Sequence, residues 1–340
     1  MSQSPERSAE RPAPTSADVA RLAGVSRATV SYVLNNTAAV RISEPTRQRV
    51  REAAEELGYV PHAAARSLRA GHSRMVLLPT AHVPIGPLYS RFFDELQWAL
   101  RRLDYTVVQY GSLGLEGDEA ARAWAELRPV AVVSFGEVQL SPHGVEILKR
   151  SGAKAVITVG PHRVEGAHAL VMDQGRVGRV AAEHLLERGR RRIGVVIPEE
   201  PGFEMFSGPR LEGARQAVVG TGATVVPLPL RYEEESANEL AGRWRELGLD
   251  AVFAYNDEYA MLLMRALQDA GISVPDETAV VGSDDLLLGR LLRPRLTTVR
   301  IDMVIGRHLA ELVDSAVRAP ESALLAQELM ASRVVARESS

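Results

Sequence analysis

Residues 15–35 read TSADVARLAGVSRATVSYVLN and hold two short helical patterns that flank a tight turn at Gly24. Thr15 is placed to cap the first helix, with Asp18 three residues later as the acidic member of a capping box. Ser26 is placed to cap the second helix in the same way. The stretch therefore predicts two helices joined by a short turn.

The two patterns share an apolar side and leave a polar face on the second helix. The apolar side comprises Val19, Ala23, Val25, Val30, Val33 and Leu34, and the exposed face comprises Arg27, Ala28, Ser31, Tyr32 and Asn35. An ordinary helical hairpin whose polar side meets water would show the same face. The small residue Ala20, four positions before the turn glycine Gly24, favours a helix-turn-helix when it is combined with these apolar positions.

In a helix-turn-helix the second helix enters the major groove, where its N-terminal side chains touch base edges. The residues of this stretch that we assign to DNA are Thr15, Ser26, Arg27, Ala28, Thr29, Ser31, Tyr32 and Asn35. A third helix completes a head of residues 15–60. Ser43 caps it, Pro45 lies in its first turn, and Gly58 lies just past its end.

This head resembles the DNA-binding domain of the lactose-repressor family of bacterial transcription regulators. The likeness continues without a break through SEPTRQRVREAAEELGYVPHAAARSLRAG (43–71). Residues 61–72 have too few apolar side chains to bury themselves, so without DNA we expect a flexible linker with a weak helical tendency. The segment resembles the family's hinge, Tyr-x-Pro-x-x-x-Ala-Arg-x-Leu, at Tyr59, Pro61, Ala65, Arg66 and Leu68.

The hinge resemblance implies a second set of DNA contacts. In the family the hinge folds on operator DNA, and a leucine from each subunit of a dimer enters the minor groove. Leu68 matches that wedge, which pries a base step apart and kinks the duplex. Arg66 and Arg69 would meet phosphate or the groove floor, and Ala65 belongs to the same set.

Charge is distributed unevenly along the 340 residues. The net charge is −3, but residues 1–74 hold 11 Arg and 7 acidic residues, which gives +4 and leaves −7 for the rest. A basic head on an acidic body is expected when one end alone meets phosphate. Hydrophobic residues make up 46% of the chain and charged residues 24%, which is typical of a globular protein.

Other features of the sequence restrict the class of protein. The chain has no cysteine, so disulfides and thiolate metal sites are excluded. Residues 1–14 lack the apolar core of a signal peptide and are expected to be a disordered tail, and no apolar run reaches membrane-spanning length. We therefore expect a cytoplasmic protein that needs no cofactor.

From residue 73 to residue 340 short β-branched runs alternate with amphipathic helical patterns. Continuous apolar strands separated by helices imply parallel sheets covered on both faces. The predicted strands are 75–78, 106–110, 130–135, 155–159, 193–197, 223–228, 251–255, 278–282 and 332–337, and the clearest helices are 90–103, 175–188, 208–219, 236–247 and 258–270. The pattern predicts an α/β body of two doubly wound subdomains, divided at about residue 172, as in periplasmic binding proteins.

Just past predicted strands, at the mouth of the expected cleft between these subdomains, lie three polar residues: Arg210, Asn256 and Asp284. A guanidinium, an amide and a carboxylate together can grip several hydroxyls of a polar ligand. Each has a simpler explanation as an ion-pair partner, a helix cap or a turn residue. The resemblance covers nearly the whole chain and is most specific over 170–196 and 253–300, and it implies effector contacts at these three positions.

Three aromatic residues, Tyr89, Phe92 and Tyr232, are candidate walls of the effector site, and each could equally belong to the core. The strand AVITV is followed by Gly160, where sugar-binding members of the family often carry an acidic residue. A sugar remains the favoured effector. The expected partners are operator DNA, this effector and a second copy of the chain, since the sequence stops soon after 332–337 without the family's tetramer-forming helix.

No catalytic constellation stands out, and the histidines show no metal-ligand spacing, so an enzyme is not predicted. The leading hypothesis is a homodimeric repressor that reads a pseudo-palindromic operator under the control of the effector. The alternatives are a solute-binding protein of a transport system and a sugar-modifying enzyme with an accessory DNA-binding head.

Overall fold

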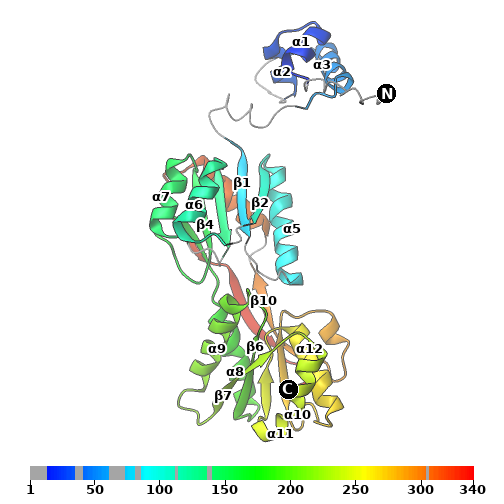
Figure 1. The fold of residues 1–340 in the computed structure, drawn as a ribbon, viewed down its shortest axis with the longest axis vertical. Coiled ribbons are helices and arrows are strands. Elements are labelled where there is room, and N and C mark those ends of the chain that lie inside the picture. Colours follow the sequence, from blue (N-terminus) through cyan, green and yellow to red (C-terminus); the bar gives the residue numbers. More distant parts are fainter. Residues whose placement is uncertain are drawn as a thin grey trace, which may run out of the picture. The chain divides into compact units, whose positions relative to one another are not determined.

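The computed structural model describes residues 14–34, 41–60, 73–80, 86–111, 114–135, 140–303 and 306–340. The chain divides into two compact units, Met1–Ser73 and Arg74–Ser340 (Figure 1). The predictions for Asn35, Ala65, Arg66, Leu68 and Arg69 lie outside the described residues, as does the predicted tail apart from its last residue.

The first unit contains the three helices that the sequence predicts, α1 (Ser16–Ala23), α2 (Arg27–Leu34) and α3 (Glu44–Glu56). The backbone N–H of Thr15 donates to the Asp18 carboxylate at 2.9 Å, which confirms the reciprocal bond of the capping box. Gly24 ends α1 with a φ of +65°, a conformation that glycine adopts without strain. The core of the unit is formed by Val19, Ala20, Ala23, Val30, Val33, Val50, Ala53 and Ala54.

The second unit contains two parallel-dominated sheets with helices on their faces, as predicted. The first sheet has the order β11-β5-β4-β3-β1-β2, and all its pairings are parallel. Its strands are β1 (Met75–Thr80), β2 (Thr106–Gly111), β3 (Ala131–Phe135), β4 (Ala155–Gly160), β5 (His168–Val171) and β11 (Ala326–Glu328). Its helices are α5 (Pro87–Arg102), α6 (Gly117–Glu126), α7 (Pro142–Arg150) and α13 (Gly306–Arg318).

The second sheet has the order β12-β10-β9-β8-β6-β7. Its strands are β6 (Arg192–Pro198), β7 (Thr224–Leu230), β8 (Ala251–Phe253), β9 (Ala279–Ser283), β10 (Thr297–Met303) and β12 (Met330–Val335). Its helices are α8 (Gln174–Glu187), α9 (Glu204–Val218), α10 (Glu234–Gly242), α11 (Trp244–Leu247) and α12 (Asp257–Asp269), and a 3₁₀ turn, η1, spans Leu288–Arg290.

The predicted division at residue 172 is wrong for the last part of the chain. The chain passes from the first subdomain to the second after β5, returns after β10, and crosses again between β11 and β12. Residues 306–328 therefore complete the first subdomain, where α13 packs on α5. A Cβ on Gly306 would lie 2.4 Å from the backbone nitrogen of Leu96, so only glycine allows this approach.

Two further details differ from the prediction. The last strand, β12, pairs antiparallel with β10, so the second sheet is not purely parallel. The helix predicted over 236–247 is two helices, α10 and α11, separated at Arg243.

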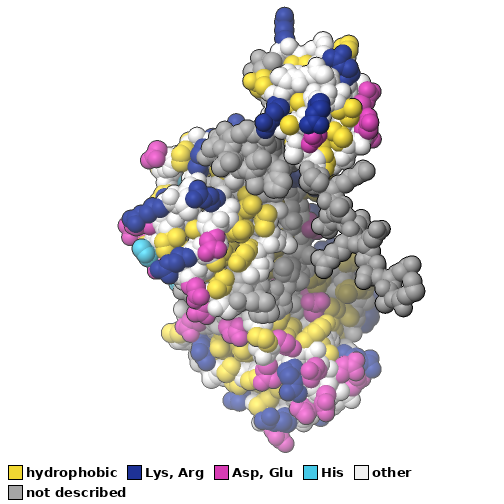
Figure 2. All heavy atoms as spheres, turned by 45° about the horizontal axis from the view of Figure 1, so that its top comes forward, with side chains coloured by type: hydrophobic (Ala, Val, Ile, Leu, Met, Phe, Trp, Pro, Cys, Tyr) yellow, Lys and Arg dark blue, Asp and Glu magenta, His cyan; other side chains and the backbone are white. Residues whose placement is uncertain are grey.

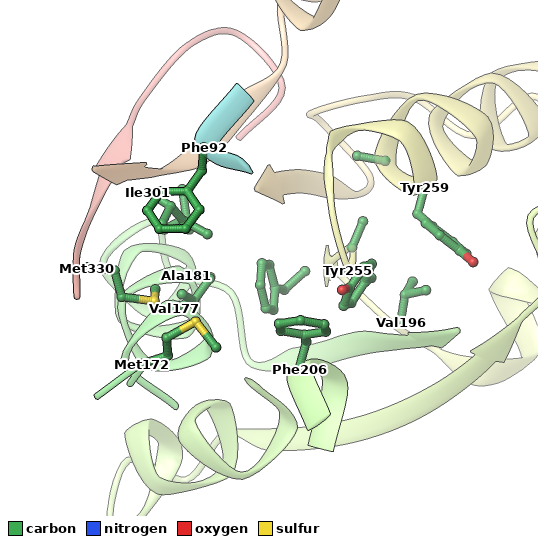
Figure 3. Close-up of a cluster of buried hydrophobic side chains, with 14 of the residues drawn as sticks. Phe92, Met172, Val177, Ala181, Val196, Phe206, Tyr255, Tyr259, Ile301 and Met330 are labelled. Carbon is green, nitrogen blue, oxygen red and sulfur yellow. The ribbon is translucent and has the colours of Figure 1, made fainter. Parts of the chain in front are cut away.

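An apolar junction forms where the crossing segments meet. Figure 3 shows Phe92 of α5 beside Ile301 of β10, with Met172 and Met330 next to the α8 side chain Val177. These residues belong to one buried cluster that includes side chains from both subdomains. The two subdomains therefore share a continuous core at the strands that connect them.

Candidate functional site

The exposed face of the head is set by the burial of the opposite side of α2. Val30 and Val33 face the core, which leaves Arg27 and Ala28 exposed and Tyr32 38% exposed. Thr29 and Ser31 are half-buried. The side chains predicted to read bases are therefore presented at the start and along one face of a well-packed helix. Figure 2 shows arginine side chains on the visible face of this unit.

The hydroxyl groups of the head also serve the local structure. Ser26 Oγ accepts the backbone N–H of Thr29 at 3.1 Å, which confirms the predicted cap of α2. Thr15 Oγ1 donates to the Asp18 carboxylate at 2.7 Å. Ser43 makes no side-chain bond to the backbone of α3 and instead shares a hydrogen bond with the Thr46 hydroxyl. These contacts hold the helices, and the assignment of Thr15, Ser26 and Thr29 to DNA stays a prediction.

In the second unit, Arg210 lies elsewhere than the sequence suggests. It is inside α9, beyond Pro209, rather than just past a strand. It is only 3% exposed, its Nε donates to Gln174 Oε1 at 2.9 Å, and its Nη1 donates to the Tyr255 carbonyl at 2.5 Å. The guanidinium also lies over the Tyr255 ring, 4.7 Å from the centroid. These contacts fix a buried cation in one orientation.

Glycines bring α9 close enough to α8 for this arrangement. A Cβ on Gly178 would lie 1.8 Å from the Arg210 carbonyl oxygen, and a Cβ on Gly213 would lie 1.9 Å from the Gly175 carbonyl oxygen. The two helix backbones therefore touch directly. This contact places Arg210 next to Gln174, the first residue of α8.

Asp284 follows β9, as predicted, in a loop with unusual backbone geometry. Asp284 and Asp285 have φ values of 100° and 54°, which non-glycine residues seldom adopt. The Asp284 N–H donates to Val299 O at 2.9 Å, and Leu286 N–H donates to the buried Asp257 carboxylate at 2.7 Å. These bonds hold the loop in place.

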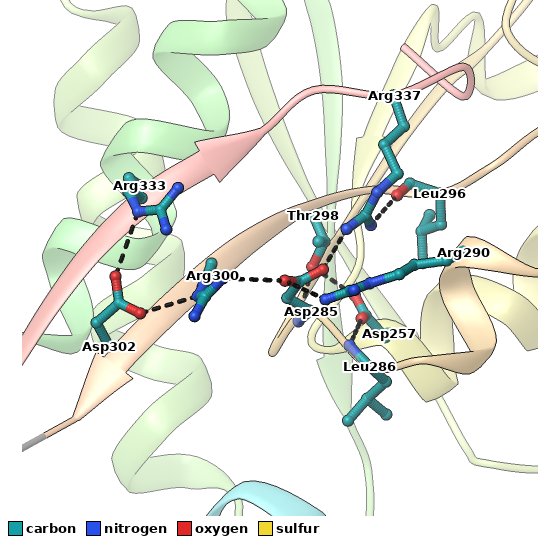
Figure 4. A network of polar contacts seen from close by, with 10 residues as sticks. All are labelled: Asp257, Asp285, Leu286, Arg290, Leu296, Thr298, Arg300, Asp302, Arg333 and Arg337. Atoms are coloured by element: carbon teal, nitrogen blue, oxygen red, sulfur yellow. Dashed lines mark hydrogen bonds and ion pairs between the residues drawn. The ribbon is translucent and has the colours of Figure 1, made fainter. Parts of the chain in front are cut away.

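Ion pairs secure the same loop from the other side. The Asp285 carboxylate is bonded to Arg337 and lies 3.0 Å from Arg290 and 3.8 Å from Arg300 (Figure 4). Burial raises the pKa of Asp285, but the hydrogen bond and charge of Arg337 outweigh it, so the pKa lies below its usual range. These ion pairs hold in place the loop that carries Asp284.

The structure confirms that Asn256 is a helix cap, the simpler of its two predicted roles. It caps α12, and its Oδ1 accepts the Tyr259 N–H at 3.0 Å. Its Nδ2 donates to Glu258 at 3.4 Å, so the amide nitrogen faces a carboxylate. A contact with effector stays a prediction for this residue.

Electrostatic interactions join Arg210, Asp284 and Tyr89 into one environment. Burial raises the pKa of Asp284, Arg210 lowers it, and Glu258 raises it further. Burial likewise raises the pKa of Tyr89, where Arg210 opposes the shift and the charge of Asp284 adds to it. The charge of Arg210 therefore acts on both Asp284 and Tyr89.

Aromatic rings from several segments surround this polar group. Phe203 lies 4.9 Å from Tyr255, Tyr232 lies 5.1 Å from Tyr259, and Tyr255 lies 5.8 Å from Tyr259, measured between ring centroids. Burial raises the pKa of Tyr255 to about 12, although Arg210 lowers it. Of the predicted walls, Tyr232 is 52% exposed and belongs to this group.

The other two predicted aromatic walls lie in the first subdomain. Tyr89 packs against Phe206 at 5.5 Å, and its hydroxyl accepts from Gln174 at 3.4 Å. Phe92 packs in the core, with its ring 6.2 Å from that of Phe135. Tyr89 therefore lies close to Arg210 and Asp284, whereas Phe92 is a core residue.

Several members of the cluster were not predicted: Gln174, Glu200, Phe203, Tyr255, Glu258 and Tyr259. Glu200 accepts the Tyr259 hydroxyl and the Tyr232 N–H, both at 2.5 Å, and so fixes two of the rings. Tyr255 was assigned to a strand, but β8 ends at Phe253. The signal for Tyr259 and Glu258 is their place in the first turn of α12, directly after Asn256.

Among the described residues, no group of three His, Cys, Asp or Glu side chains could hold a metal ion. Within the same part of the chain, no helix is long and apolar enough to cross a membrane.

Comparison with known proteins supports this picture. Residues 15–62 match the model of bacterial regulatory proteins, lacI family, and residues 182–340 match that of a periplasmic binding protein-like domain. The HTH-type transcriptional regulator GalR of Escherichia coli K12 is 30% identical over 309 residues, which cover 87% of each chain. The chain belongs to the LacI family.

Solved structures agree with the family assignment. The lac repressor dimer bound to operator and the anti-inducer ONPF has a TM-score of 0.74 at 22% identity, covering 96% of this chain and 99% of that one. The transcriptional regulator CelR–cellobiose complex has a TM-score of 0.62 at 25% identity, covering 96% and 100%. As a LacI-family protein, the chain is a DNA-binding transcriptional regulator with an α/β effector-binding body.

Proposed function

We propose that this regulator is a homodimeric repressor that reads a pseudo-palindromic operator and responds to a small polyhydroxyl effector, favoured to be a sugar. Two heads of one dimer would each place α2 in the major groove, with Arg27 and Tyr32 as the main readers. By family resemblance, Ala65, Arg66, Leu68 and Arg69 would act in the minor groove. A repressor of this kind works on chromosomal DNA, so we place it in the cytoplasm and assign it no catalytic activity.

The observation that carries the effector proposal is the pair Arg210 and Asp284. Among the described residues, Arg210 Nη2 and Asp284 Oδ2 have no hydrogen-bond partner, so a donor and an acceptor that interact electrostatically remain available to a ligand. Neighbouring hydroxyls of one sugar match such a pair, because each hydroxyl both donates and accepts. The exposed ring of Tyr232, which packs on Tyr259, offers an apolar surface for the face of the sugar ring.

The relatives support the same class of ligand. One solved relative is a complex with cellobiose, and another solved LacI-family regulator contains ribose. The acidic residue that sugar-binding members often carry after the fourth strand of the first subdomain is replaced here by Gly160, a buried glycine at the end of β4. We therefore assign hydroxyl recognition to Asp284 and Glu258 of the second subdomain.

The alternative, a solute-binding protein without a DNA role, is not favoured because residues 15–62 form a DNA-binding domain of the family. Selection of bound fragments from a random DNA pool tests the proposal. A repressor of this kind should enrich one site with two inverted half-sites. Enrichment of no sequence, together with tight binding of a sugar, would support the solute-binding alternative instead.

The effector part is tested with the selected operator, labelled with a fluorophore. Its anisotropy in complex with the protein is followed while mono- and disaccharides are added one by one. At least one sugar should change operator affinity. A response to anionic metabolites alone would contradict the polyhydroxyl assignment.

A further inference from the structure

Gln174 occupies a position that the proposed function does not explain. It is the first residue of α8, directly after the chain crosses from the first subdomain to the second. Its side chain is buried and reaches Met330, a member of the apolar junction. A buried amide in such surroundings needs partners for both its oxygen and its nitrogen.

The amide finds these partners on both subdomains. Its Oε1 accepts from Arg210 of α9, in the second subdomain, at 2.9 Å. Its Nε2 donates to the Tyr89 hydroxyl of α5, in the first subdomain, at 3.4 Å, and contacts Met330 Sδ at 3.5 Å where β12 begins. One side chain therefore links the effector arginine to the other subdomain and to a crossing strand.

The two ends of this link differ in strength. The bond to Arg210 is short and charge-assisted, whereas both contacts of Nε2 are long and one is to a thioether, a weak acceptor. A rotation that separates α5 from α8 and α9 would break the contact of Nε2 with Tyr89 first. Gln174 would then stay with Arg210 and release Tyr89.

We propose that Gln174 is a latch between the subdomains, which holds the present conformation through Tyr89 and adjusts its strength according to the position of Arg210. A ligand that draws the guanidinium toward Asp284 also pulls on Gln174 Oε1. The strength of the latch and the affinity for the ligand are then coupled in both directions. The coupling rests on the proposed function of Arg210, whereas the latch itself does not.

The absence of cysteine makes the latch directly measurable. Arg150 on α7 and Val219 after α9 are strongly exposed and lie in different subdomains. Arg150→Cys and Val219→Cys introduce two spin labels, and electron–electron double resonance gives the distribution of distances between them. The measurement is made on the full chain without ligand, so it does not depend on knowing the effector.

Gln174→Met keeps the length of the side chain but removes both hydrogen-bonding groups. We expect the population at the present distance, relative to the population at a second distance, to fall by about fivefold. This is the effect of losing one ordinary hydrogen bond. Gln216→Met is the matched control, because Gln216 lies on the exposed face of α9 and contacts only Arg179 and Glu212. Its distribution should equal that of the unsubstituted protein.

Tyr89→Phe serves as a second variant, since it removes one hydroxyl and keeps the packing on Phe206. Tyr89→Phe should shift the distance distribution in the same direction as Gln174→Met. If Gln174→Met does not fold, Tyr89→Phe tests the latch by itself. Unchanged distributions in the folded variants would overturn the latch. This outcome is separate from any failure to find an operator or a sugar, which would overturn only the proposed function.

Discussion

The backbone of Gly178 rests against the carbonyl group of Arg210, so closely that a Cβ at residue 178 would lie 1.8 Å from the carbonyl oxygen. Real atoms cannot approach to this distance. The position of Arg210 is therefore determined by a contact between two helix backbones, α8 and α9, as much as by its own side-chain bonds.

This relationship predicts the effect of Gly178→Ala. The added methyl group must push α9 away, which should reduce the free energy of unfolding by about 1–3 kcal/mol or more and displace Arg210. Gly242→Ala is the matched control, because Gly242 lies in a helix, α10, and a Cβ at that position meets nothing within 4 Å. It should leave stability unchanged or raise it by up to about 1 kcal/mol. Equal denaturant midpoints for both variants would show that the helices can separate freely.

The head allows a test of base reading. Arg27 is exposed at the start of α2, where a bidentate contact to guanine is available. Arg27→Ala should cost roughly 1–3 kcal/mol on the selected operator and relax preference at one base pair of each half-site. Arg21→Ala, which removes an exposed arginine of α1, should leave the preferred sequence unchanged. If Arg27→Ala weakens binding to all sequences equally, then Arg27 contacts only phosphate.

His168 predicts a dependence of stability on pH. Its Nδ1 accepts the Leu325 N–H at 3.1 Å, a bond that only the neutral ring can make, and it helps to hold β11 beside β5. Burial, with a contribution from Lys149, lowers the pKa of His168 below its usual value of about 6.5. The unfolded chain therefore binds the proton more readily than the folded chain does.

Neutral His168 stabilises the folded state in full above a pH of about 6.5, the usual pKa of histidine. This stabilisation is lost as the pH falls through the lower pKa that His168 has in the folded state. The free energy of unfolding should therefore decrease between about pH 7 and pH 5, and His168→Gln should reduce that decrease. Buried His184 contributes with the same sign, so part of the slope should remain.

The sequence predicted those parts of the fold whose signals are local. Thr15, Asp18 and Ser26 identified both helix starts of the head, because capping depends on residues three positions apart. Apolar runs predicted the central strands of both sheets. The crossing strand β10 was missed because Arg300 and Asp302 interrupt its apolar pattern, and β11 was missed because Ala326–Glu328 is short and exposed.

The site was harder to predict because its members meet only through tertiary packing. The sequence predicted a helix over 208–219 and a position just past a strand for Arg210, but α9 begins at Glu204 and contains Arg210. Gln174 lies 36 positions from Arg210 and 85 from Tyr89. No spacing rule joins such residues, so the resemblance to the family predicted Arg210 and Asp284 while Gln174 required the structure.

The central claim is that Arg210 and Asp284 bind the effector that controls the operator. Removing either residue leaves polar groups of the ligand unpaired, at a cost of about 1–3 kcal/mol, which corresponds to about a tenfold loss of affinity or more. The exposed arginine Arg215 on the same helix supplies the matched control.

The most direct measurement is the fluorescence anisotropy of labelled operator, titrated with the sugar that alters its binding, for the unsubstituted protein and for Arg210→Ala, Asp284→Asn and Arg215→Ala. The account predicts that all four proteins bind operator alike without sugar, and that Arg210→Ala and Asp284→Asn each need at least about ten times more sugar for the same response, while Arg215→Ala responds normally. Loss of operator binding and thermal stability in the first two variants, without a selective loss of the sugar response, would contradict it.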